Sequence, residues 1–355
     1  MVLYLGVIGI TTLLGWLCQH VKKKQKKILF IFMVLVPTLI SGLRGVGTDY
    51  FLYQIRYESL ISNVTILRDG TTLTGPFYLY FEFFEKIGLG YQAAIFIVSL
   101  LTIGIAFYII FDLEDQVNTT FAVFSFMSMY YLLSFNLFRQ VLAGEMFVLS
   151  VHLYSKTRNK KSFWIPMLIG CLIHSSVILY GFFYLVFPFV KNKKRGKQSV
   201  YFILFVFVFS MPLIARFLSN FAAYLPHYAY YFLHFGYMGI GLGILRYVFL
   251  VWLPILYFCY GKSTRLCSNM WQEYIFVAII GSILCLSSYV SDTFLYRIGY
   301  TGLFVMPLLH GVMIKNFKRN KQLMAIGLGL FLLLFFYYDF IYLNSGEVFP
   351  YEFFW

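Results

Sequence analysis

Long apolar stretches, each about as long as a membrane crossing, fill most of this chain and leave few charged residues between them. A helix needs about 20 residues to cross the hydrocarbon core of a bilayer. Inside that core every backbone N–H and C=O must be bonded within the protein, which restricts spanning structures to helices and closed barrels. With 61% hydrophobic and 12% charged residues, we predict an all-α, polytopic membrane protein, with residues 1–355 forming a single integral membrane domain.

Five short basic runs interrupt the apolar stretches and predict the direction of each crossing. They are residues 22–27, 156–161, 191–197, 262–265 and 315–321. Cytoplasmic loops of membrane proteins carry an excess of lysine and arginine, so we expect all five runs on the cytoplasmic face. Orientation in the membrane then accounts for the net charge of +14, and no nucleic acid is expected as a partner.

An even number of crossings must separate consecutive basic runs, which predicts about twelve helical segments with both termini outside the cytoplasm. The expected full spans are residues 1–18, 28–43, 91–111, 119–135, 136–155, 199–218, 242–260, 271–289, 298–314 and 323–343. The main extracytoplasmic loops are then residues 44–90 and 219–241. Residues 1–18 lack the basic n-region of a signal peptide, so we expect a retained span.

The interval 162–190 is too short for two full spans, yet basic runs lie at both of its ends. Two short helices that meet at His174-Ser175-Ser176 would return the chain to the cytoplasm as a broken hairpin packed inside protein. A single tilted helix is the rival interpretation, and it would invert every later crossing. We prefer the hairpin because it keeps the later basic runs on one side.

In this predicted topology, lysines and arginines fall mainly on opposite sides of the membrane. Sixteen of the 17 lysines are expected inside, whereas seven of the 11 arginines fall outside or at outer helix ends. These seven are Arg44, Arg56, Arg68, Arg139, Arg216, Arg246 and Arg297. A planar guanidinium matches phosphate and carboxylate, so we predict an anionic, diphosphate-bearing ligand in an outer-face cavity. Snorkelling at the membrane interface is the alternative, and it has most weight for Arg216 and Arg246.

Two titratable side chains are candidates for proton transfer near this level. Asp49 would either activate a hydroxyl group as a general base or simply cap a helix that begins at Tyr50. His174 lies beside two serines at the predicted helix break, either as a base or as a core imidazole that holds the turn. Glu145 is expected deeper in the membrane, where a structural counter-ion is the more natural interpretation than a catalyst.

Neither a metal nor a cofactor is expected. No spacing of histidine, cysteine and carboxylate residues indicates a metal site, and the five cysteines show no paired extracytoplasmic pattern. The Gly-Lys-Ser of a phosphate-binding loop does not follow Gly45 and Gly47. The energy for any reaction must then come from the substrate itself or from an ion gradient.

Six motifs are spread along nearly the whole chain. In order, they are Arg44-x-x-Gly47-Thr48-Asp49-Tyr50-x-x-Tyr53, Gly75-Pro76-Phe77-Tyr78, Phe138-Arg139-Gln140-x-Leu142-Ala143, His174, Arg297 and Pro350-Tyr351. This set resembles the EpsG-type family, the Wzy-like polymerases of bacterial exopolysaccharide and capsule. The family usually carries a glutamate where Gly75 stands, so no role for that carboxylate is transferred.

The resemblance implies a GT-C-like membrane glycosyltransferase of the bacterial cytoplasmic membrane that joins undecaprenyl-diphosphate-linked repeat units on the outer face. It implies that Asp49 or His174 activates the acceptor hydroxyl. The implied diphosphate- and sugar-binding residues are Arg44, Arg139, Gln140, Arg297, Tyr50, Tyr53, Tyr78 and Tyr351. No cofactor is implied, and the expected partners are the lipid-linked oligosaccharide, membrane lipid and a chain-length regulator.

A lipid-linked oligosaccharide flippase or exporter is the main rival from another class, because its cavity would also be cationic. A flippase is expected to show two related halves, and the sequence shows none. A glycan ligase would use much the same chemistry as a polymerase. A membrane acyltransferase would more naturally place its histidine near a cytoplasmic acyl donor.

Overall fold

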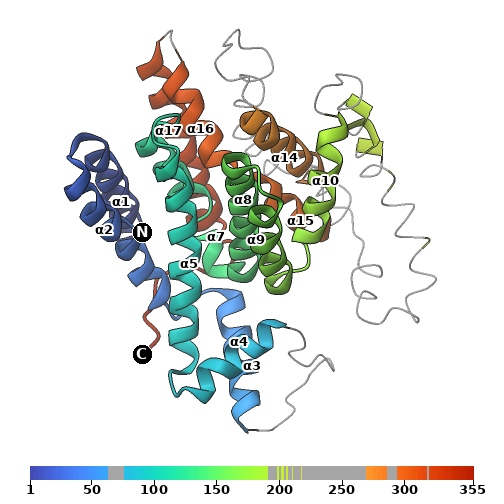
Figure 1. Cartoon of the computed structure of the whole chain (residues 1–355). Coiled ribbons are helices and arrows are strands. Elements are labelled where there is room, and N and C mark those ends of the chain that lie inside the picture. Colours follow the sequence, from blue (N-terminus) through green and yellow to red (C-terminus); the bar gives the residue numbers. More distant parts are fainter. Residues whose placement is uncertain are drawn as a thin grey trace.

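The computed structural model describes residues 1–62, 76–190, 269–285, 294–317 and 320–355, with scattered positions between 198 and 217. Within these residues the chain is almost entirely helical, and the only β-type pairing is one isolated bridge (Figure 1). The predicted all-α membrane protein is therefore confirmed. The expected span 242–260 and the expected loop 219–241 lie outside the described residues, as does most of 199–218.

The helices follow one another along the whole described chain. They are α1 (Val2–His20), α2 (Lys23–Gly42), α3 (Thr48–Ser62), α4 (Pro76–Lys86), α5 (Gly90–Asp112), α6 (Thr119–Met129), α7 (Leu133–Asn136), α8 (Phe138–Thr157), α9 (Lys160–Ile173), α10 (Val177–Val190), α14 (Asn269–Cys285), α15 (Phe294–Leu303), α16 (Met306–Asn316) and α17 (Lys321–Phe336), which continues into a π-helical turn, η4 (Tyr337–Tyr342). Helix α8 packs against α5, α9 and α15, and so lies in the interior (Figure 1).

Five stretches of the described residues are long and apolar enough to cross a membrane. They are Val2–His20, Lys23–Gly42, Gly90–Asp112, Ile298–Asn316 and Lys321–Tyr342. Each coincides with an expected span to within a few residues. Their apolar side chains point both inward and outward, as Phe107 is buried in α5 while Leu101 of the same helix is 45% exposed. A helix that is apolar all round suits a protein core on one side and lipid on the other.

Polar side chains define several helix starts. The Asn118 side chain accepts a hydrogen bond from the Phe121 N–H at 2.9 Å at the start of α6. The Asn159 side chain accepts one from the Lys161 N–H at 3.0 Å at the start of α9. These bonds satisfy N–H groups that the first turn of a helix leaves without intrahelical partners. The cytoplasmic turns expected from the sequence are thus fixed by local capping.

The predicted broken hairpin is confirmed. Helix α9 ends at Ile173, His174 is extended, and α10 begins at Val177. The rings of Phe163, near the start of α9, and Tyr184 of α10 stack with centroids 4.5 Å apart. This contact requires the two helices to run antiparallel. The chain therefore returns to the end from which it came, as the charge pattern required.

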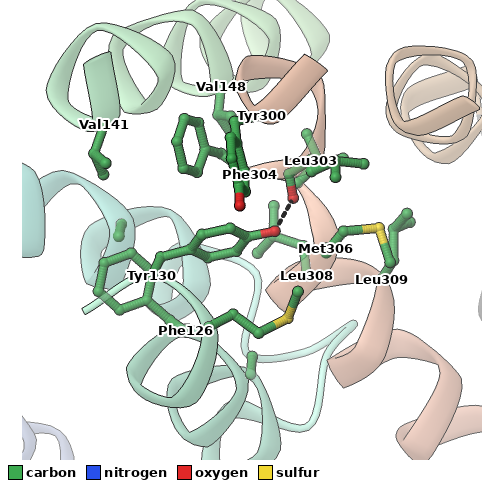
Figure 2. Close-up of a cluster of buried hydrophobic side chains, with 14 of the residues drawn as sticks. Phe126, Tyr130, Val141, Val148, Tyr300, Leu303, Phe304, Met306, Leu308 and Leu309 are labelled. Carbon is green, nitrogen blue, oxygen red and sulfur yellow. Dashed lines mark hydrogen bonds between the residues drawn. The ribbon is translucent and has the colours of Figure 1, made fainter. Parts of the chain in front are cut away.

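Two other expected spans are interrupted. Residues 119–135 form α6 and α7 with irregular backbone at Tyr130–Leu132, and the span near 298–314 breaks between Leu303 and Met306. The two breaks face each other, because the Tyr130 hydroxyl donates a 2.7 Å hydrogen bond to the Leu303 carbonyl (Figure 2). Irregular backbone is tolerated at membrane depth where protein buries it and supplies such partners.

The segment expected as the extracytoplasmic loop 44–90 contains two helices, α3 and α4, at the end of the molecule where α5 begins (Figure 1). An aromatic cluster holds them there, and its buried members are Tyr50, Tyr53, Tyr57, Phe77, Phe81, Phe84, Tyr91 and Phe138. The Tyr57 hydroxyl also donates to the Glu85 carboxylate, and this links the two helices. Packing of aromatic rings therefore orders a segment whose charged residues had indicated a loop.

Three of the five basic runs meet at the opposite end. The Lys26 and Glu114 side chains form an ion pair at 2.7 Å, and the Lys315 ammonium donates to the Glu114 carbonyl at 2.8 Å. Lys156 pairs with Asp112 at 2.7 Å. The acidic turn after α5 therefore lies among the basic residues, and the runs at 191–197 and 262–265 lie in whole or in large part outside the described residues. That this end is cytoplasmic stays a prediction.

Candidate functional site

Arg44 follows directly after α2 and is completely enclosed, with 0% of its surface exposed. Its guanidinium donates to the carbonyl of Ser41, to the Ser99 hydroxyl at 3.3 Å and to the Phe135 carbonyl at 3.2 Å. It also lies 4.8 Å from the centre of the Phe135 ring. These contacts join the end of α2 to α5 and α7. In this conformation the charge of Arg44 can act on a ligand electrostatically, but a ligand cannot contact its side chain.

The environment of Arg44 contains hydroxyls, carbonyls and aromatic rings, and no carboxylate pairs with it in the described part of the chain. Burial lowers the pKa of Arg44, while the nearby tyrosines Tyr91 and Tyr50 oppose that shift. A buried cation without a counter-charge gives its surroundings a positive potential, since the low-dielectric interior screens it weakly. This potential favours an anion at the adjacent surface.

Arg139 occupies the first turn of α8 and is only partly buried. Its Nε and Nη2 groups donate to the Ile173 carbonyl at 3.2 and 2.9 Å, and Nη1 donates to the Tyr53 hydroxyl at 2.6 Å. The guanidinium lies 4.7 Å from the centre of the Phe77 ring. A guanidinium has five N–H donors, so these three bonds fix its orientation and leave donors for a ligand.

His174 lies at the break between α9 and α10. It directly follows Ile173, whose carbonyl accepts hydrogen bonds from Arg139. Its Nδ1 accepts a hydrogen bond from the Ser176 backbone N–H at 3.3 Å and lies 2.8 Å from the Ser176 hydroxyl. With Nδ1 as an acceptor, the proton of the neutral imidazole resides on Nε2. The role of His174 as a base stays a prediction.

Asp49 lies in the first turn of α3, which begins at Thr48. The side-chain oxygen of Asn136 accepts hydrogen bonds from the Asp49 N–H, at 3.3 Å, and from the Thr48 hydroxyl. Helix α3 begins at Thr48, two residues before the start at Tyr50 that the capping interpretation of Asp49 assumed, and Asn136 of α7 supplies a cap at this end. Asn136 had not been predicted as a site residue.

The hydroxyl groups of the predicted site tyrosines Tyr50, Tyr53 and Tyr351 bond to other groups of the protein, so these residues hold the site together more than they line it. Tyr50 and Tyr53 are 3% and 8% exposed, and the Tyr50 hydroxyl donates to the Gln92 side chain at 2.8 Å. The Tyr351 hydroxyl donates to the Ile40 carbonyl at 3.0 Å, and burial raises the pKa of Tyr351 to about 12. Tyr50 and Tyr53 lie one turn apart on α3, so this helix connects Arg44 with Arg139.

Three predicted site residues contribute less to this picture. Gln140 of α8 is buried, with 3% of its surface exposed. Tyr78 belongs to α4 and Arg297 to α15, and their side chains lie outside the described part of the structure. Their predicted roles stay predictions.

The C-terminal tail forms a lid of backbone hydrogen bonds over the loop between α2 and α3. The Gly45 N–H donates to the Glu352 carbonyl at 2.8 Å, and the Phe354 N–H donates to the Leu43 carbonyl at 3.2 Å. A β-carbon on Gly45 would lie 2.7 Å from the Phe353 carbonyl oxygen. Only glycine permits this approach. Sequence reasoning noted Pro350-Tyr351 but gave no contact that would place it here.

The site as a whole is suited to an anion. The N-termini of α3 and α8, the enclosed Arg44, the half-open Arg139 and His174 lie at the same end of the molecule, and helix N-termini favour negative charge. Among the described residues no group of three histidine, cysteine or acidic side chains could hold a metal.

The chain matches the EpsG family over residues 27–353. No curated protein and no solved structure gives a match. The matched range runs from α2 to the C-terminal tail and includes Arg44, Asp49, Asn136, Arg139 and His174. With more than nine-tenths of its length matched, the chain belongs to the EpsG family.

Proposed function

We propose that this protein is a membrane glycosyltransferase that polymerises oligosaccharide repeat units carried on a lipid diphosphate. The observation that carries the proposal is membership of the EpsG family, which implies a polysaccharide-polymerase-like role and, in general terms, a lipid-linked oligosaccharide substrate. The finer assignment is an undecaprenyl-diphosphate carrier and a reaction on the outer face of the bacterial cytoplasmic membrane. The concentration of cationic and N–H donor groups at one end of the bundle supports it.

The reaction needs an acceptor hydroxyl and a departing lipid diphosphate. The hydroxyl oxygen of the incoming unit bonds to the anomeric carbon of the growing chain, the bond from that carbon to the diphosphate oxygen breaks, and the hydroxyl proton passes to a base. Asp49 is the proposed base, since it lies in the first turn of α3, five residues after Arg44. General-base catalysis of this kind contributes about 10²- to 10⁴-fold.

The leaving diphosphate gains negative charge as the bond breaks, and three groups are proposed to stabilise it. Arg139 would donate through its remaining guanidinium N–H groups, His174 would bond to it from the α9–α10 break, and enclosed Arg44 would contribute a positive potential. Donors that are already oriented before the reaction stabilise a transition state without reorganising. Activation resides in the lipid diphosphate itself, so the proposed reaction consumes no nucleotide.

The test is reconstitution of the purified protein in liposomes with a synthetic lipid-diphosphate-linked repeat unit. We expect a ladder of lengthening products by gel or mass spectrometry, and Arg139→Gln is expected to abolish it. Lys86→Gln is the matched control, because Lys86 is exposed on α4 and pairs with Glu82 of the same helix. Translocation of the substrate without lengthening would indicate a flippase, and a single transfer to a different acceptor would indicate a ligase.

A further inference from the structure

Glu145 is an acidic residue in the interior of the helix bundle with no role in the proposed reaction. It lies on α8, seven residues after the first residue Phe138, and so about 10 Å along the helix from the site. It is 2% exposed, and its Oε1 atom has no hydrogen-bond partner among the described residues. Because buried polar atoms are nearly always hydrogen-bonded, a carboxyl oxygen without a partner inside a membrane-spanning bundle is expected to bind a ligand.

A small cavity adjoins this carboxyl group. The volume open to the centre of a water molecule is about 10 Å³, which is close to the space that one water requires. Apart from Glu145, the described residues that line it are apolar, with Ala106 from α5, Phe126 from α6, and Phe304 and Leu308 from the region of the α15–α16 break. None of these described lining residues is a second carboxylate. A divalent cation, which takes six or more oxygen ligands, does not fit.

The break between α15 and α16 borders this cavity through Phe304. Figure 2 shows that Phe304 lies beside Tyr130 of the α6–α7 break. Phe304, between α15 and α16, lies against α8 so closely that a β-carbon on Gly144 would be 2.1 Å from its ring. Its ring also packs on Tyr130 of the α6–α7 break, with centroids 4.9 Å apart. Tyr130 of the α6–α7 break is an ionisable group near Glu145, and its hydroxyl donates a hydrogen bond to the Leu303 carbonyl.

We propose that Glu145 is a neutral carboxylic acid that donates its proton to one internal water, making this cavity a proton- and water-binding site in the middle of the bundle. An ionised carboxylate is strongly disfavoured in such surroundings unless a cation or several donors pair with it. The walls supply neither. A water accepts the acid proton and donates to the unbonded Oε1 or to a backbone carbonyl of the breaks. This inference does not depend on the glycosyltransferase assignment.

Infrared spectroscopy of the reconstituted protein tests the proposal at neutral pH. The difference between wild type and Glu145→Gln is expected to contain the carbonyl band of a neutral carboxylic acid. Glu273→Gln is the matched control: Glu273 is also buried, at 4%, but it pairs with Arg158 and accepts a bond from Tyr184. Its removal is expected to delete a carboxylate band. Glu145→Asp should retain an acid band at a shifted frequency, and it decides the matter if the glutamine variant does not fold.

A cavity-filling variant tests the water. Ala106→Val adds two methyl groups to the cavity wall and is expected to expel the water and shift the acid band to the frequency of an acid without a hydrogen bond. An acid band that does not move in Ala106→Val would overturn the water assignment. A carboxylate band for Glu145 in wild type, or one that appears on addition of sodium ions, would overturn the proton site as well.

Discussion

At the scale of single residues, Arg44 and Arg139 show that two arginines of one motif set can have different tasks. Arg44 is enclosed and its two terminal guanidinium nitrogens bond to groups of the protein, whereas Arg139 is partly buried and retains donors. Sequence reasoning treated both as ligand-binding residues, because residue type and position along the chain do not report enclosure. The packing of α2, α5 and α7 around Arg44 separates its guanidinium from the surface.

Arg139→Lys separates the shape of the guanidinium from its charge. Lysine keeps the charge but cannot hold the Ile173 carbonyl and the Tyr53 hydroxyl with a planar fork. Loss of oriented, charge-assisted hydrogen bonds of about 1.5–3 kcal/mol predicts a fall in polymerisation rate of about 10- to 100-fold. The measurement is the initial rate with lipid-linked repeat units. Wild-type activity in this variant, with Lys86→Gln as control, would remove Arg139 from the diphosphate site.

Asp49→Asn tests whether this carboxylate is a base. Because Asn136 supplies the cap of α3, the thermal unfolding temperature is expected to stay near that of wild type. Polymerisation is expected to fall by about 10²-fold or more, in line with loss of a general base. Unfolding by fluorescence-detected thermal denaturation and product formation are measured on the same preparation. An active Asp49→Asn variant would leave Asp49 with no more than a favourable charge at a helix N-terminus.

At the scale of elements, the C-terminal tail and the loop before α3 act as one unit. Four backbone bonds connect residues 344–354 with residues 43–48, and the Tyr4 hydroxyl of α1 donates to the Val348 carbonyl. The tail thereby covers Arg44 and helps to orient the start of α3. A segment at the end of the chain is thus part of the site that begins at residue 44.

Gly45→Ala is expected to separate the C-terminal tail from the loop before α3. The added β-carbon would lie 2.7 Å from the Phe353 carbonyl oxygen, and such overpacking costs about 1–3 kcal/mol. We expect a lower unfolding temperature together with reduced polymerisation. Gly327→Ala in α17 is the control, since nothing lies within 4 Å of its added carbon and alanine favours a helix. Equal stability of the two variants would show that the tail is not held as the structure describes.

The elements also show where sequence patterns succeed and where they fail. Counting crossings between basic runs required a hairpin within 162–190, and the break at His174 followed from it. The break at Tyr130–Leu132 was missed because no glycine or proline interrupts that apolar run. The break before α16 carried a signal, since Pro307 stands in the first turn of the new helix, where proline is favoured. Tertiary contacts, such as Tyr130 with Leu303, stabilise both breaks.

At the scale of the whole molecule, the two ends of the bundle differ in chemistry. One end joins three basic runs to the acidic turn after α5 through Lys26, Lys156 and Lys315. The other holds Arg139, His174 and the C-terminal tail. Partition of lysine to one end is the arrangement that the positive-inside rule produces, and the rule predicts that the site faces outward.

Single-cysteine labelling in a cysteine-free background checks this orientation. Lys24→Cys and Glu352→Cys lie at opposite ends, and both positions are exposed. A membrane-impermeant thiol reagent added to intact cells is expected to label Glu352→Cys, and to label Lys24→Cys only after the membrane is opened. The reverse pattern would place the site on the cytoplasmic face and contradict the proposed use of externally presented substrate.

The sequence by itself determined the class of this protein as a helical membrane protein. The length of its apolar stretches and the positions of its basic runs are properties of the chain that govern insertion into a bilayer. It determined the broken hairpin for the same reason. It also pointed to the segment at Arg44, Asp49 and Arg139, since polar side chains at the end of an apolar run require polar partners. Tertiary structure alone decided which arginine is enclosed, that Asn136 caps α3, and that the tail closes over Gly45. Those outcomes depend on contacts between residues 87 to 311 positions apart, which no local pattern encodes.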